Sequence, residues 1–159
     1  MKLSLVTAVL LLIVLSGAIV QGKETVSGNS SVVSLTTGKV QGQIQNGIYV
    51  YKGIPYARAD RFMPPEPSRS WDGIRIFTEY GHVCPQVPMP AENDFISNQR
   101  IAVEGEDCQN LNVWTPGIND NKKRPVMVWL HGGGFQTGSS IEQRVYDGAN
   151  LSRKGDVVV

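Results

Sequence analysis

The sequence has 159 residues, of which 41% are hydrophobic and 18% are charged, and this is the composition of an ordinary globular protein rather than of a disordered or fibrous one. Its 15 basic and 14 acidic side chains nearly cancel, to a formal net charge of +1. This balance argues against a nucleic-acid partner, and the short basic run at Lys122–Arg124 is better interpreted as a solvated loop.

Residues 1–22 have the pattern of a signal peptide. Lys2 gives a positive start, a short apolar stretch runs from Leu5 to Leu15, and Val20 and Gly22 precede the expected cleavage point. An uncleaved anchor is the alternative, but an anchor needs about 20 predominantly apolar residues, and serine and threonine dilute this stretch. We therefore expect a mature portion of residues 23–159, a secreted or periplasmic location, and no membrane association after cleavage.

The stretch from Val32 to Tyr51 is typical of β-structure. We predict strands over Val32–Leu35, Val40–Gln45 and Ile48–Tyr51. The last two flank Asn46-Gly47, which is a strong hairpin signal because both residue types accept the positive φ of a type I′ turn. This antiparallel piece is expected at one edge of a larger sheet.

The next part of the chain is rich in proline. Residues 53–67 are predicted to be an ordered but irregular connection, because proline fixes φ and removes backbone donors. The chain has two cysteines, Cys84 and Cys108. In an exported protein an even count favours a disulfide at the base of the polar loop 92–106, and two buried free thiols are the alternative.

Short apolar segments dominate the last third of the chain. Leu111–Trp114 is predicted to be a strand, and Val126–Leu130 a strand buried on both faces of a mostly parallel sheet. A short helix is expected over Tyr146–Lys154. Because Val157–Val159 then begin an apolar strand at which the sequence stops, we expect a truncated fold, and we expect the 159-residue chain alone to be inactive and poorly folded.

A glycine cluster, His131-Gly132-Gly133-Gly134-Phe135, follows the predicted strand directly. Without Cβ atoms the backbone can turn sharply and present successive N–H groups, which suits the negative charge that develops on a carbonyl oxygen. A flexible turn without chemistry is the alternative. The preceding strand and the flanking residues favour an oxyanion hole, in which His131 orients the loop and Phe135 anchors it in apolar surroundings.

Four motifs, in order, resemble the type B carboxylesterase family, which includes the cholinesterases. They are Gly53-Ile54-Pro55-Tyr56-Ala57 with Arg61-Phe62-Met63-Pro64-Pro65, Cys84-Pro85-Gln86, Glu106-Asp107-Cys108-Gln109-Asn110-Leu111-Asn112-Val113-Trp114-Thr115-Pro116, and Val128-Trp129-Leu130-His131-Gly132-Gly133-Gly134-Phe135. The resemblance implies the N-terminal part of an α/β-hydrolase fold, in which an antiparallel edge hairpin leads into a mostly parallel central sheet.

The resemblance also implies roles for individual residues. Gly133 and Gly134 match the glycines that supply two donors of the oxyanion hole, and Gly132 belongs to the same loop. Cys84 and Cys108 match a family disulfide. Arg61 and Glu106 match a structural ion pair that ties the Arg-Phe segment to the Glu-Asp-Cys segment.

Two departures from the family pattern bear on chemistry. No tryptophan lies between Cys84 and Cys108, where cholinesterases carry one that binds choline, so a quaternary-ammonium substrate is not supported. No G-x-S-x-G occurs in the sequence. Ser139 and Ser140 are poor candidates for the nucleophile, and His82 and His131 for its base, because the family places its serine, acid and histidine after the oxyanion loop.

The expected function is therefore that of one part of a larger enzyme. We expect the intact protein to hydrolyse small-molecule carboxylic esters through a serine acyl-enzyme, without a metal or an organic cofactor, and this chain to supply the oxyanion hole but not the nucleophile. A non-catalytic, cholinesterase-like adhesion or binding protein is the alternative, and a truncated gene product without its own function is a third possibility.

Overall fold

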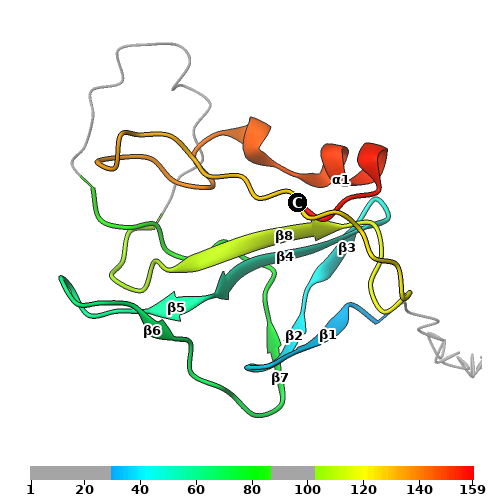
Figure 1. Cartoon of the computed structure of the whole chain (residues 1–159), viewed down its shortest axis with the longest axis horizontal. Coiled ribbons are helices and arrows are strands. Elements are labelled where there is room, and N and C mark those ends of the chain that lie inside the picture. Colours follow the sequence, from blue (N-terminus) through cyan, green and yellow to red (C-terminus); the bar gives the residue numbers. More distant parts are fainter. Residues whose placement is uncertain (1–29, 87–102) are drawn as a thin grey trace, which may run out of the picture.

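The computed structural model describes residues 30–86 and 103–159. The predicted signal peptide and most of the polar loop 92–106 lie outside the described residues. Most elements are short strands, followed by one turn of 3₁₀ helix and one short α-helix (Figure 1). They are β1 (Val32–Leu35), β2 (Gly38–Gln41), β3 (Gln43–Gln45), β4 (Ile48–Pro55), β5 (Ala57–Arg58), β6 (Glu66–Pro67), β7 (Ile74–Ile76), β8 (Asn110–Thr115), η1 (Arg144–Tyr146) and α1 (Ala149–Gly155).

The predicted hairpin is present between β3 and β4. Asn46 and Gly47 have φ values of 49° and 78°, and the strands pair antiparallel, with Gln45 opposite Ile48. The predicted strand 40–45 is divided at Gly42, where a Cβ would lie 2.3 Å from the Val50 carbonyl oxygen. Because of this break, β2 pairs in one sheet with β1 and β7, whereas β3 pairs in another with β4 and β8.

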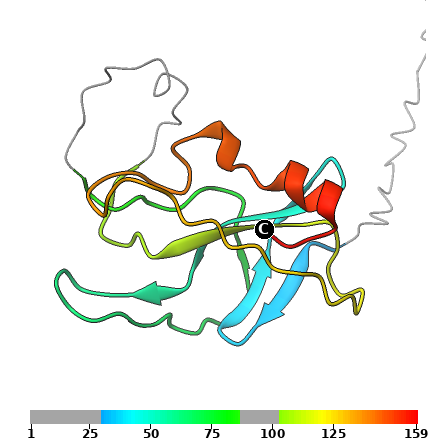
Figure 2. The same ribbon diagram turned by 45° about the horizontal axis from the view of Figure 1, so that its top comes forward.

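Strand β4 is the centre of the core. Its first four residues are all buried, because they face two different layers. Tyr49 and Tyr51 pack in a cluster with Val40 of β2, whereas Ile48 and Val50 pack in a second cluster with Trp114 of β8. The sheet β3-β4-β8 therefore lies between the sheet β1-β2-β7 on one face and α1 on the other (Figures 1 and 2).

The connection after β4 is more regular than the sequence predicts. Strand β4 continues to Pro55 across a register shift between Tyr51 and Ile54, and β5 and β6 form a small antiparallel ribbon. Gly53 has a φ of 73° at this shift, and its N–H donates to Asn112 Oδ1 over 3.0 Å. Strand β7, which the sequence does not predict, pairs with β2 in parallel.

The sheets are mixed rather than mostly parallel in the described part of the chain. All neighbours within them are antiparallel except β2 and β7, and two isolated parallel bridges join Val83 to Glu104 and Val126 to Val158. Val159 exchanges backbone hydrogen bonds of 2.9 Å with Trp114, which places this segment beside β8. The predicted mostly parallel sheet is thus represented only by the segment around Val158 and its bridge to Val126.

The C-terminal helix is shorter than predicted. Helix α1 begins at Ala149, whose N–H donates to the Asp147 carboxylate over 3.0 Å, and it ends before Asp156, which has a left-handed φ of 48°. Over residues 30–86 and 103–159, no helix has the length and apolar character needed to cross a membrane.

Candidate functional site

The glycine loop folds into a tight turn that only glycine fits at one position. Gly133 has a φ of 121°, and its carbonyl oxygen accepts hydrogen bonds from Gln136 N–H and Thr137 N–H, over 3.1 and 3.2 Å. A Cβ on Gly133 would lie 1.8 Å from the Thr137 carbonyl oxygen. Gly134 has a φ of 61°, and no atom lies within 4 Å of the position that a Cβ would take. The cluster is therefore an ordered turn rather than a flexible one.

The amide groups of this turn are available to a ligand. Both glycines are exposed, and no acceptor in the described ranges takes a hydrogen bond from the N–H of Gly133 or of Gly134. Backbone N–H groups fixed by a rigid turn can stabilise a developing oxyanion without reorganising during the reaction. The turn can therefore act as a donor site for a carbonyl oxygen.

Two neighbours of the glycines differ in their role. His131 Nδ1 lies 2.7 Å from the Gly132 carbonyl oxygen, and because a carbonyl only accepts, this contact needs a proton on Nδ1. Phe135 is fully exposed, with a φ of 59°, so the expectation that it anchors the loop is wrong for this structure. The reason is that no apolar side chain in the described residues covers its ring.

The segment before the loop is not the buried strand that the sequence predicts. Val128 and Leu130 are 78% and 82% exposed, and within the described ranges the segment pairs only through the isolated bridge at Val126. Its hydrogen bonds run from Met127 N–H to the Val158 carbonyl and from Val158 N–H to the Pro125 carbonyl. A strand needs a neighbour along its whole length, and the described residues supply one at this end alone.

Three polar side chains hold the segment after the loop. Gln86 pairs with Gly138, whose N–H donates to Gln86 Oε1 over 2.6 Å. Asn112 Nδ2 donates to Ser140 Oγ over 3.2 Å, and Ser139 N–H donates to the carboxylate of Glu142 over 3.3 Å. The loop itself contributes no buried side chain from residue 131 to residue 136, so these contacts fix its end.

Two contacts that the family resemblance implies are present nearby. A disulfide joins Cys84 and Cys108, with the Cα atoms 5.0 Å apart. Arg61 contacts Glu106 with two guanidinium nitrogens, and the Nε donates to Oε2 over 3.3 Å. Hydrogen bonding from Arg61 lowers the pKa of the Glu106 carboxyl, but both side chains are exposed, so solvent screens the pair.

Neither serine near the loop is arranged as a nucleophile. Ser139 is buried, and its Oγ accepts from Ile141 N–H over 3.4 Å, while the Ser140 hydroxyl accepts from Asn112. Among the described residues, no histidine nitrogen hydrogen-bonds to either hydroxyl. The base that would activate them is absent from this part of the chain.

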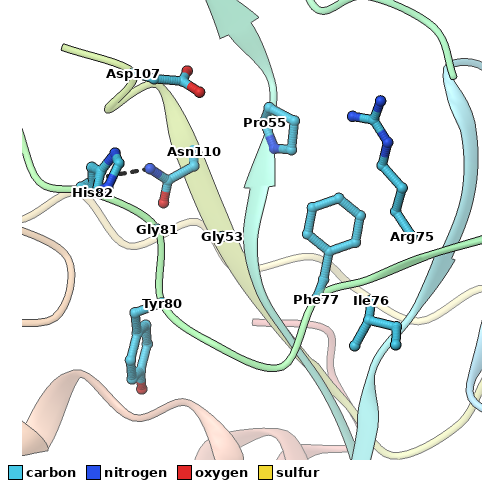
Figure 3. Close-up of a pocket in the computed structure, with 10 residues that line it drawn as sticks. All are labelled: Gly53, Pro55, Arg75, Ile76, Phe77, Tyr80, Gly81, His82, Asp107 and Asn110. Atoms are coloured by element: carbon cyan, nitrogen blue, oxygen red, sulfur yellow. Dashed lines mark hydrogen bonds between the residues drawn. The ribbon is translucent and has the colours of Figure 1, made fainter. Parts of the chain in front are cut away.

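An open hollow of about 500 Å³ lies beside β4, away from the glycine loop. Figure 3 shows Arg75 and Phe77 on one side of it and His82 and Asp107 on the other, with the Asn110 amide donating to the His82 carbonyl oxygen over 2.9 Å. The residues that line it include no serine, threonine or cysteine. It therefore lacks the usual nucleophiles of acyl transfer, and the glycine loop is the better candidate.

Strong pKa shifts lie away from the loop. Burial, together with neighbouring Tyr49, raises the pKa of Tyr51 to about 12, and hydrogen bonding from Arg124 lowers the pKa of Asp120 to about 2. Both groups belong to contacts that hold the fold, the Tyr51 hydroxyl donating to the Ser31 carbonyl over 2.9 Å. Within the described ranges, no three side chains of the metal-binding types gather into a cluster.

Sequence reasoning missed the residues that support the loop. Gln86 stands in the quoted Cys84-Pro85-Gln86 motif and Asn112 in the Glu-Asp-Cys motif, but nothing in their spacing indicates that they contact Gly138 and Ser140. A signal was present in the polar character of Asn112, because a polar side chain inside an otherwise apolar strand requires a hydrogen-bond partner.

Comparisons with known proteins identify the family of this chain. The family model described as "Carboxylesterase family" matches residues 29–159. The chain is 39% identical over 132 residues to para-nitrobenzyl esterase of Bacillus subtilis, covering 80% of the chain and 26% of that protein. It is 35% identical over 153 residues to liver carboxylesterase 1F of Rattus norvegicus, covering 84% of the chain and 27% of that protein.

Solved structures give the same result. A Clostridium hathewayi esterase, described as able to hydrolyse aliphatic aromatic polyesters, matches with a TM-score of 0.78 and 44% identity, over 82% of the chain and 26% of that structure. The chain thus spans about a quarter of the length of the relatives that it matches. These neighbours are esterases of the α/β-hydrolase fold, and the mixed sheets described above are consistent with a part of that fold.

Proposed function

Because this chain belongs to the carboxylesterase family, we propose that the intact protein hydrolyses carboxylic esters through a serine acyl-enzyme. In this proposal Gly133 and Gly134 donate two hydrogen bonds to the oxyanion. The observation that carries it is the pair of free, exposed N–H groups in a turn whose geometry excludes any side chain at Gly133. The relatives named above are esterases, which does not favour a non-catalytic binding protein.

The reaction divides between this chain and residues outside it. A serine oxygen would attack the ester carbonyl carbon and pass its proton to a histidine, and the carbonyl oxygen would become the oxyanion that the two glycines stabilise. Collapse would expel the alcohol, which takes up the proton, and water would release the acid in a second round. No G-x-S-x-G occurs in these 159 residues, so the serine would come from outside them.

The same division applies to the fold. We propose that Val126–Leu130 and Val157–Val159 are neighbouring strands of a mostly parallel central sheet, of which the Val126–Val158 bridge is the beginning. The exposure of Val128 and Leu130 supports this, because apolar strand residues of this kind are normally covered on both faces. Residues 1–22 would direct the protein out of the cytoplasm. In an oxidising compartment outside it, the Cys84–Cys108 disulfide is stable.

The test uses the full-length reading frame. We expect it to hydrolyse p-nitrophenyl acetate with a burst of p-nitrophenol equal to the enzyme concentration, and to be labelled once by a fluorophosphonate. The Gly133→Pro variant should lose the steady-state rate, because proline removes the N–H donor. Hydrolysis without a burst or labelling would exclude the serine mechanism, and a full-length protein that hydrolyses no ester would exclude the proposed function.

A further inference from the structure

Gln86 makes a two-point contact with the backbone of Gly138, 52 residues away in the sequence. The Gly138 N–H donates to Gln86 Oε1 over 2.6 Å, and Gln86 Nε2 donates to the Gly138 carbonyl oxygen over 3.4 Å. A carboxamide presents one acceptor and one donor side by side, as a peptide group does. The side chain therefore pairs with Gly138 much as a neighbouring strand would.

Gly138 in turn touches the beginning of the glycine loop. It has a φ of 95°, and a Cβ on it would lie 2.6 Å from the Gly132 carbonyl oxygen and 3.0 Å from His131 Nδ1. Its predecessor, Thr137, closes the loop by donating to the Gly133 carbonyl oxygen. A residue that fixes Gly138 therefore fixes the place where the two ends of the loop meet.

The other end of this contact is tied to the core sheet. Gln86 stands two residues after Cys84, whose disulfide partner Cys108 stands two residues before β8. Strand β8 pairs with β4, the most buried strand of the described chain. The segment with Gln86 and the loop with Gly138 lie side by side in both views of the ribbon (Figures 1 and 2).

The remaining supports of the loop act farther along the chain. Asn112 reaches the Ser140 hydroxyl and Glu142 reaches the Ser139 N–H, one or two residues beyond Gly138. Glu142 Oε2 also lies near Gly138, 3.3 Å from where a Cβ would stand, but neither Asn112 nor Glu142 hydrogen-bonds to Gly138. Gln86 is therefore the side chain whose hydrogen bonds act most directly on the loop.

We propose that Gln86 is a positioning residue of the oxyanion loop, which holds Gly138 against Gly132 and so keeps the Gly133 and Gly134 donors in place. This inference rests on the proposed function of the loop. In this proposal the Cys84–Cys108 disulfide also supports the loop, because it holds in place the segment from which Gln86 hydrogen-bonds to Gly138.

The experiment compares variants of the full-length protein, with rates normalised to active sites titrated by diethyl p-nitrophenyl phosphate. Gln86→Met keeps the size of the side chain and removes both contacts, so we expect kcat to fall about 10- to 100-fold, while KM changes less than about twofold. Affinity for a trifluoromethyl ketone, which forms an oxyanion on the enzyme, should fall in parallel. Gln86→Glu keeps the 2.6 Å acceptor and should retain kcat within about fivefold.

The matched control is Gln43→Met, which removes another glutamine-to-backbone hydrogen bond, from Gln43 Nε2 to the Thr78 carbonyl oxygen over 3.4 Å. It should leave kcat unchanged. If Gln86→Met lowers only the number of titratable sites, or has the kcat of Gln43→Met, Gln86 is merely structural and the inference is wrong. Gln86→Ala, which removes the same two contacts, replaces the methionine variant if that variant does not fold.

A second readout separates this inference from the proposed function. Hydrogen exchange at the Gly138 amide should be slow in the wild-type protein and fast in Gln86→Met, whether or not the protein hydrolyses esters. An inactive wild-type protein with this exchange pattern would refute the proposed function and leave the contact between Gln86 and the loop in place. Fast exchange at Gly138 in the wild-type protein would overturn the inference, whatever the activity.

Discussion

Replacing Gly133 by alanine should destroy the donor geometry of the loop, whereas the same change one residue earlier should be harmless. The added Cβ on Gly133 would lie 1.8 Å from the Thr137 carbonyl oxygen, whereas real Cβ contacts are essentially never under 3.0 Å, so the two must separate by about 1.2 Å. The φ of 121° adds strain, because side chains of L-residues rarely accept it. A displacement of about 1 Å at a catalytic group costs about 100-fold in rate.

We therefore expect Gly133→Ala to lower kcat of the full-length protein about 100- to 1,000-fold, the effect of losing one oxyanion donor, or about 2.7–4 kcal/mol of transition-state stabilisation. The assay is the steady-state hydrolysis of p-nitrophenyl acetate per titrated active site. KM should change little, because the ester in its ground state does not need these donors.

The neighbouring glycines are matched controls. Gly132 has no positive φ and no atom within 4 Å of its Cβ position, so Gly132→Ala should keep kcat within about threefold. Gly134 also has open space, but its φ of 61° costs alanine about 1 kcal/mol, so Gly134→Ala should be intermediate. Equal rates for a folded Gly133→Ala and for Gly132→Ala would refute the placement of the oxyanion donors in this turn.

Three further predictions concern the stability of the full-length protein. Burial raises the pKa of Tyr51 from 10.0 to about 12, so folding favours its neutral form. At about 1.36 kcal/mol per pKa unit, about 2.7 kcal/mol of stability should be present below pH 10 and lost as the pH rises through about 12. Urea titrations should show a smaller loss in Tyr51→Phe, and an equal loss would contradict the assignment. The double variant Cys84→Ser/Cys108→Ser opens a loop with a sequence separation of 24 and should be less stable by about 3 kcal/mol in urea unfolding, an effect that reduction of the wild-type protein should reproduce. Arg124→Met should lower Tm by a few degrees in calorimetry. The Arg124 side chain is only 7% exposed, and its guanidinium hydrogen-bonds to Asp120 and to Asp156 over 2.7 Å each. A Tm equal to that of Lys123→Met would show that these ion pairs are not structural.

Local chemistry made part of the fold predictable. The turn at Asn46-Gly47 follows from two residue types that accept positive φ, and the strand at Val32–Leu35 is found with the predicted bounds. The Cys84–Cys108 disulfide was expected from an even count of cysteines. Each of these features depends on residue type or on a count, so the sequence was enough.

Other features needed partners that are distant in the chain. The predicted strand 40–45 divides at Gly42 because β2 and β3 pair in different sheets, and the Val50 carbonyl oxygen leaves no room for a side chain at this position. Strand β7 has three residues, Ile74–Ile76, and all are exposed; their apolar-polar-apolar alternation is too short to predict a strand, which forms because β2 lies beside it. The prediction of a buried strand over Val126–Leu130 was wrong for the described chain, since burial depends on neighbours that a local pattern cannot count.

The sequence by itself therefore determined the family motifs, the glycines that the loop requires, the hairpin and the cysteine pair, because side-chain chemistry and backbone freedom are local properties. Only the tertiary structure decided that the Gly133 and Gly134 N–H groups donate no hydrogen bond within the described residues and that the Phe135 ring is exposed to solvent. The same is true of the hydrogen bonds between Gln86 and Gly138. These are contacts between residues up to 52 positions apart, and which of them form is decided by how the core sheet places the two segments, not by the residues themselves.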